Sequence, residues 1–153
     1  VKWYSWVSLG SSFLMSELHA SYLYPQISCY KDVIKKRKKV YEEYLKYLDF
    51  NNDHFFLVKN NSCFEYNYNG LVLVMKKNNY EKLINYLKKN KIFAFIGYIP
   101  LHVSSYGKKF LKKGDSLSTT DDLYDKIVRL PVHTNLTNKD IKFISKKIIN
   151  FFK

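Results

Sequence analysis

The chain has little of what disulfide-linked or zinc-stabilised folds require. Its 153 residues include two cysteines, which lie far apart and form no CxxC pair. A chain of this length can bury a core of its own, so the two thiols need no disulfide and indicate a reducing compartment. No histidine pairs with a second histidine or with a cysteine at zinc-ligand spacing, which argues against a metal site. We interpret the four histidines as packed or surface residues: His19, His54, His102 and His133.

Long apolar runs and a secretion signal are also missing. No stretch reaches the roughly 18 apolar residues that a membrane-spanning helix needs. The first residues lack the order of basic head, apolar stretch and small-residue cleavage site that marks a signal peptide. These absences predict a cytoplasmic protein. The chain begins at Val1, in an irregular and aromatic-rich stretch and without a methionine, so we expect that a further segment precedes it.

Several motifs of nucleotide-binding and hydrolytic enzymes are absent. The sequence contains no GxGxxG, no GxxxxGK[ST] and no GxSxG. Its 13 carboxylates fall mostly in predicted helix faces and caps. A complete catalytic constellation therefore cannot be assembled from this chain alone.

Arginine is nearly absent although the net charge is +13, because only Arg37 and Arg129 accompany the 24 lysines. Nucleic-acid interfaces favour arginine for bidentate contacts, so the lysine excess indicates a compositional origin in an AT-rich coding sequence. A selected polyanion site is the alternative. The KKRKK run at 35–39 falls inside a predicted helix. We interpret it as a solvent-exposed face of that helix, with a phosphate-binding patch as the alternative.

The chain is rich in apolar and aromatic residues, at 46% and 18%, which predicts a folded globular domain. Periodicity and turn residues predict one α+β unit, a small sheet covered by helices, without repeats or linkers. The expected helices cover 18–48, with Ser16 as N-cap and an interruption at Pro25, and then 80–90, 117–128 and 137–152; the expected strands cover 55–58, 64–75 and 92–99.

Several segments in order carry a family resemblance. They resemble the C-terminal part of the DegT/StrS-type sugar-nucleotide aminotransferases, which depend on pyridoxal phosphate (PLP). The Gly-Ser-Ser turn and the Tyr4-Ser5-Trp6 lead-in are similar to one branch, the dTDP-4-amino-4,6-dideoxygalactose transaminases of enterobacterial common antigen synthesis. The matching segments are SLGSSFLMSELHASYLYPQI at 8–27, YIPLH at 98–102, Gly107 and Phe110, Thr120-Asp121, VRLPV at 128–132 and Leu136-Thr137.

The resemblance implies a fold and a cofactor. Residues 1–153 would form the small C-terminal domain of a fold-type-I aminotransferase, with a connecting segment over 1–16. The family's Schiff-base lysine lies in a large N-terminal domain whose motifs this chain does not contain. The isolated chain is therefore expected to be inactive and to require the large domain or a homodimeric partner. Without them, aromatic residues such as Trp3, Trp6 and Phe13 would be exposed and would promote association.

The resemblance also assigns site residues. Ser12, with Ser11 beside it, occupies the position of the family's asparagine that reaches the PLP phosphate. Leu14 replaces an arginine of the family. Tyr98 and His102 match the Tyr-x-Pro-Leu-His motif and are expected to line the sugar-nucleotide side of the site. Gly97 stands where the similar branch has histidine. Asp121 replaces a glutamate of the family and keeps the carboxylate on a shorter side chain.

The expected activity is amino transfer from L-glutamate to the 4-keto carbon of a dTDP-4-keto-6-deoxyhexose by the intact enzyme. Two alternatives from other classes stay open. One is a basic nucleic-acid-binding module, supported by the charge and by 14 tyrosines; however, no RNP-type or helix-turn-helix pattern appears. The other is a structural subunit of a split enzyme.

Overall fold

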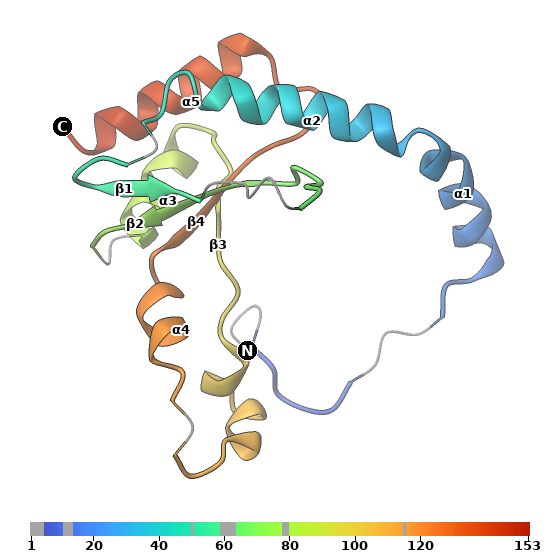
Figure 1. Cartoon of the computed structure of the whole chain (residues 1–153), viewed down its shortest axis with the longest axis vertical. Coiled ribbons are helices and arrows are strands. Elements are labelled where there is room, and N and C mark those ends of the chain that lie inside the picture. The colour runs from blue at the N-terminus through green and yellow to red at the C-terminus, as the bar shows by residue number, and fades with distance from the viewer. Residues whose placement is uncertain (1–4, 11–13, 50, 59–63, 78–79, 115) are drawn as a thin grey trace.

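The computed structural model describes residues 5–10, 14–49, 51–58, 64–77, 80–114 and 116–153. It has the predicted α+β class, with a four-stranded antiparallel sheet in the order β1-β2-β4-β3 (Figure 1). The strands are β1 (Phe55–Leu57), β2 (Leu71–Met75), β3 (Phe95–Ile96) and β4 (Ile127–Leu130). The α-helices are α1 (Glu17–Ser28), α2 (Tyr30–Tyr44), α3 (Tyr80–Lys89), α4 (Ser118–Leu123) and α5 (Asn138–Phe151), and the short 3-10 helices are η1 (Leu101–Val103) and η2 (Gly107–Phe110).

Strand β4 is absent from the sequence-based prediction, which placed a helix over 117–128. That helix ends at Leu123 as α4, and the chain turns into β4 four residues later. β4 lies between β2 and β3 and pairs with both, so hydrogen bonds satisfy both of its edges. The β-branched residues at its start suit this central position. Long-range pairing therefore outweighs the local helical signal.

Two strands are shorter than predicted. The strand expected over 64–75 begins only at Leu71, because Tyr68 adopts a left-handed backbone with a φ of 48°, which an extended strand does not contain. The strand expected over 92–99 is reduced to Phe95–Ile96. A turn precedes β1, where the Asn52 side chain accepts hydrogen bonds from the backbone N–H groups of His54 and Phe55.

One face of the sheet forms the core with helices α2, α3 and α5. Side chains alternate across a strand, and the inward set of β2 and β4 is almost completely buried: Leu71, Leu73, Met75, Val128 and Leu130. The helices contribute the stripes that their periodicity predicted, including Ile141, Ile144 and Ile148 of α5. Residues on the other face, among them Phe56, Phe95 and Arg129, remain partly exposed. Among the described residues, the helices that complete the core thus pack on one face of the sheet.

The N-terminal part of the chain extends away from this core (Figure 1). Helix α1 is capped by Ser16, as predicted, and continues through Pro25 to a break at Cys29, where α2 starts. None of its residues is buried. Trp6 instead packs onto the η2 region, where its ring stacks on Phe110 and meets Tyr106 edge-on. Trp6 is therefore not the exposed aromatic that was expected, while Trp3 and Phe13 lie outside the described residues. No helix in the described ranges combines the length and apolar character needed to cross a membrane.

Candidate functional site

The segment after β3 places Tyr98 at the edge of the sheet. The backbone N–H of Gly97 donates to the carbonyl of Ile127 at 3.2 Å, so the chain still follows β4. A Cβ at Gly97 would lie 3.1 Å from the Ile127 side chain, which is tighter than ordinary contact. The glycine at this position therefore fits the isoleucine opposite it. A histidine, as in the similar branch, would require Ile127 to move.

Tyr98 separates two adjacent hollows, and we call the two together the Tyr98 groove. They share Tyr98, Ile99 and Tyr124, and their volumes are about 600 Å³ and about 470 Å³. The larger one has an apolar lining completed by Pro100, Leu101, Thr120, Leu123 and Ile127. The smaller one is more polar and is completed by Ser5, Tyr80, Glu81, Ile96, Gly97 and Val103.

His102 and Asp121, both singled out by the sequence motifs, meet beside this groove. The Nε2 of His102 lies 2.7 Å from the Oδ1 of Asp121, and the His102 side chain is only 15% exposed. Neither residue lines the two hollows, although their neighbours Leu101 and Thr120 do. The pair links η1 to α4 across 19 residues of sequence. It therefore fixes the two elements that carry one wall of the Tyr98 groove.

Arg129 of β4 lies beside the groove without lining either hollow, contacts two of the lining residues and was not among the expected site residues. Its Nε–H donates to the carbonyl of Ile96 at 2.9 Å, and its guanidinium carbon lies 4.9 Å from the centroid of the Tyr98 ring. Such a position allows a cation–π contact. Two signals were available: arginine is uncommon in this chain, and Arg129 lies in the matching VRLPV segment just after the helix predicted over 117–128. Neither signal placed it against Tyr98.

The more polar hollow has an acidic side. The hydroxyl of Tyr80 donates to Glu81 at 3.4 Å. Burial, followed by the nearby carboxylates of Glu81 and Asp125, raises the pKa of Tyr80, so its hydroxyl is kept as a hydrogen-bond donor. The Oδ1 of Asp125 is buried without a hydrogen-bond partner among the described residues. This side of the groove therefore offers acceptors and phenolic donors.

The predicted PLP-phosphate residues, Ser11 and Ser12, lie outside the described residues. The structure resumes with Leu14, which is fully exposed. The Oγ of Ser16 accepts from the backbone N–H of His19 at 3.4 Å as the N-cap of α1. The N-cap expected from the sequence is confirmed, and the phosphate contact stays a prediction.

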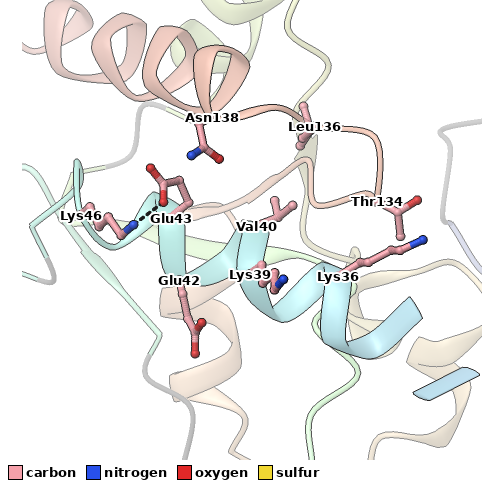
Figure 2. Close-up of a pocket in the computed structure, with 9 residues that line it drawn as sticks. All are labelled: Lys36, Lys39, Val40, Glu42, Glu43, Lys46, Thr134, Leu136 and Asn138. Atoms are coloured by element: carbon pink, nitrogen blue, oxygen red, sulfur yellow. Dashed lines mark hydrogen bonds and ion pairs between the residues drawn. The ribbon is translucent and has the colours of Figure 1, made fainter. Parts of the chain in front are cut away.

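A further hollow of about 450 Å³ lies between α2 and the start of α5 (Figure 2). Lys46 donates to Glu43, and this hydrogen bond lowers the pKa of the carboxyl and raises that of the ammonium. Lys36 and Lys39 are exposed, which agrees with the solvated-face interpretation of the KKRKK run. Leu136 is the residue of a matching segment that lines this hollow, and none of the described site residues that the resemblance assigned does, so the Tyr98 groove is the better candidate site.

The described lysines do not fit the covalent attachment of PLP. A lysine that forms an imine at neutral pH is usually desolvated or held next to another cation. Every described lysine is exposed except Lys126 and Lys147, which are half-buried. Lys126 pairs with Asp122, and Lys147 lies over the ring of Phe143. We therefore derive no chemical step through the cofactor from these residues.

Comparison with known proteins identifies the class. The profile of the DegT/DnrJ/EryC1/StrS aminotransferase family matches residues 2–149, and the chain belongs to this family. No curated protein sequence matches this chain significantly.

Solved structures share the fold. DesV from S. venezuelae, solved in complex with a ketimine intermediate, has a TM-score of 0.80 and 16% identity over 98% of this chain and 40% of its own. Helicobacter pylori PseC, an aminotransferase involved in the biosynthesis of pseudoaminic acid, has a TM-score of 0.77 and 18% sequence identity. The match covers 95% of this chain and 40% of PseC. A DegT DnrJ EryC1 StrS aminotransferase from Brucella abortus has a TM-score of 0.74 and 20% sequence identity. The match covers 86% of this chain and 34% of the Brucella protein. This chain therefore spans about 40% or less of the structures that it matches.

Proposed function

We infer that this chain is the small C-terminal domain, residues 1–153 with a connecting segment over 1–16, of a PLP-dependent sugar-nucleotide aminotransferase. The observation that carries the proposal is the family match over residues 2–149. The gathering of Tyr98, His102 and Asp121 at one groove supports it, because these residues come from separate motifs of the sequence. The same match favours this proposal over a nucleic-acid-binding module.

The proposed reaction is transfer of the amino group of L-glutamate to the 4-keto carbon of a dTDP-4-keto-6-deoxyhexose. Its product in the branch that the Gly-Ser-Ser turn resembles is dTDP-4-amino-4,6-dideoxygalactose, a precursor in enterobacterial common antigen synthesis. Such a substrate is cytoplasmic, and so is the proposed enzyme. PLP supplies an electron sink once it is joined to the substrate nitrogen. A lysine for its covalent attachment belongs to the large domain, supplied by another segment or by a partner.

Within that reaction the residues of this chain bind and position. Ser11 and Ser12 carry hydroxyls that can donate to the PLP phosphate. Tyr98 lines the sugar-nucleotide side of the groove, and His102 approaches that side from beside the lining. The bond between His102 and Asp121 holds the imidazole in one orientation, so the ring keeps a fixed position next to the groove wall that Leu101 and Thr120 form.

The first experiment is a PLP titration of the purified chain, followed by borohydride trapping and peptide mass mapping. We expect no stoichiometric adduct, because the described lysines are solvent-exposed or paired. A stoichiometric adduct on one lysine would contradict the assignment as a non-catalytic domain.

The second experiment supplies the lysine-bearing domain by co-expression from the same genome. We expect glutamate-dependent amination of a dTDP-4-keto-6-deoxyhexose, and a reduced rate with the His102→Ala variant. The matched control is His133→Ala, which alters an exposed histidine outside the Tyr98 groove. Absence of turnover by the folded complex with any 4-keto sugar nucleotide would refute the proposed activity.

A further inference from the structure

We propose that Arg129, which lies against Tyr98 beside the Tyr98 groove, is an oxyanion-binding residue and anchors a negatively charged group of the substrate there. The inference rests on the proposed function for the identity of the substrates. It concerns a residue of β4 that the family motifs did not assign. The two candidate groups share one chemistry: the diphosphate of the sugar nucleotide and the carboxylate of the amino donor.

Arg129 is held in a fixed position with part of its donor set still available. The hydrogen bond from Nε to the Ile96 carbonyl uses one donor, and the Tyr98 ring supports one face of the guanidinium. Guanidinium has five N–H donors in a planar fork, so four remain on its two Nη atoms. A fork of this kind matches carboxylate and phosphate oxygens in a bidentate manner. A half-buried arginine that is already oriented loses little entropy when it binds such an anion.

Two other basic side chains near the groove already have acidic partners. His102 pairs with Asp121, and Lys126 pairs with Asp122. Among the described residues, no carboxylate lies within ion-pair distance of Arg129. An anion can therefore bind to Arg129 without breaking an internal ion pair.

The residue type at this position supports the same reading. Lysine accounts for 24 of the 26 cations in the chain, so position 129 departs from the prevailing composition. A lysine ammonium is a point charge without a planar fork. It would not reproduce the simultaneous contact with the Ile96 carbonyl and the Tyr98 ring. The geometry of this position therefore suits arginine better than lysine.

The test uses the fact that the chain contains only two arginines. An ¹⁵N-labelled sample is expected to give two arginine Nε–H signals, which the Arg37→Lys and Arg129→Lys variants assign. The chain is titrated separately with dTDP, L-glutamate and inorganic pyrophosphate at about 150 mM salt, which screens non-specific attraction to a cationic surface. Thymidine serves as the uncharged control for dTDP, and Arg37 on α2 is the internal control for the arginine signal.

We expect saturable shifts of the Arg129 signal without a shift of Arg37, and no shift with thymidine. Arg129→Lys and Arg129→Met should weaken binding by about tenfold or more, because a charged hydrogen-bonded contact is lost. Backbone amide spectra show whether each variant is folded. Tyr98→Leu, which keeps the cation and removes the ring, should move the Arg129 signal and weaken binding as well.

The ligand that saturates the signal identifies the bound group. A response to dTDP assigns Arg129 to the diphosphate, and a response to L-glutamate assigns it to the carboxylate. A response to pyrophosphate alone supports the oxyanion site and counts against the proposed substrates, so the two proposals can fail separately. Equal shifts at both arginines, no shift at Arg129, or unchanged affinity in folded Arg129→Met would overturn the inference.

Discussion

Single residues connect parts of this chain that are distant in sequence. His102 contacts Asp121 across 19 residues, Arg129 contacts Ile96 across 33, and the Tyr44 hydroxyl reaches the carbonyl of Pro131 across 87. The first two contacts lie at the candidate site, and the third joins α2 to the residue that follows β4. At the residue scale, the candidate site is therefore held in place by a few polar contacts on an apolar framework.

Tyr44 provides a direct test of such a contact. Its side chain is fully buried, and its hydroxyl donates to the Pro131 carbonyl at 3.1 Å. Burial raises the pKa of Tyr44, so the hydroxyl stays a donor across the usual pH range. We expect Tyr44→Phe to lower the free energy of unfolding by about 1 kcal/mol, because a buried carbonyl loses its partner. Urea denaturation measures this loss.

The control for this change is Tyr24→Phe, which removes the same hydroxyl from an exposed residue of α1. Its free energy of unfolding should equal that of the parent chain within error. Equal effects of the two substitutions would show that the Tyr44 contact does not stabilise the fold.

Helix α5 is the element whose ends and face follow most directly from sequence. Thr137 caps it, and Asp140 completes a capping box by accepting from the Thr137 backbone and hydroxyl. Periodic isoleucines then place one face in the core. In contrast, the local sequence over 117–128 predicts one helix, whereas pairing with β2 and β3 makes 127–130 a strand.

The capping box predicts a pH-dependent stability. Thr137→Ala should lower the free energy of unfolding by about 1 kcal/mol near neutral pH, the usual cost of removing a threonine cap. The hydrogen bonds from Thr137 hold the pKa of Asp140 below its usual range. Their contribution is therefore complete above the unfolded-state pKa of about 4 and is lost as the pH falls through the folded-state value. The difference between the two chains should shrink as the medium is acidified.

Denaturation series at neutral and acidic pH check this prediction, with Thr134→Ala as the control outside the box. Thr134 precedes the helix, and within the described ranges its hydroxyl donates to the side chain of Asn135 and takes no part in the box. A gap between parent and Thr137→Ala that widens in acid would contradict the assigned role of Asp140.

The whole molecule leaves apolar surface uncovered. α1 carries Leu18 at 82% exposure and Tyr22 at 76%, one helical turn apart, and its main packing partner among the described elements is the adjacent α2. Monomeric proteins rarely expose contiguous patches of this kind. Because the chain spans about 40% of the length of its structural relatives, we expect this helix to associate with a second copy when it is studied alone.

Sedimentation analysis of the isolated chain tests that expectation. The parent should self-associate, and the double variant Leu18→Lys with Tyr22→Lys should shift toward the monomer. The control is Ser21→Lys with Gln26→Lys, which adds the same charge to α1 and retains the apolar residues. A monodisperse parent monomer would contradict the prediction.

The sequence by itself determined the class of the fold, the helices α3 and α5, the inward-facing stripe and the family. These features arise from local periodicity, caps and motifs in register, and each requires only residues that are close along the chain. It also singled out Tyr98, His102 and Asp121, but it gave no indication that the last two touch. Tertiary structure alone decided that 127–130 is a strand, that Gly97 faces Ile127, and that Arg129 lies against Tyr98. These depend on pairing between strands remote in sequence, whose free energy is gained only once the sheet has formed.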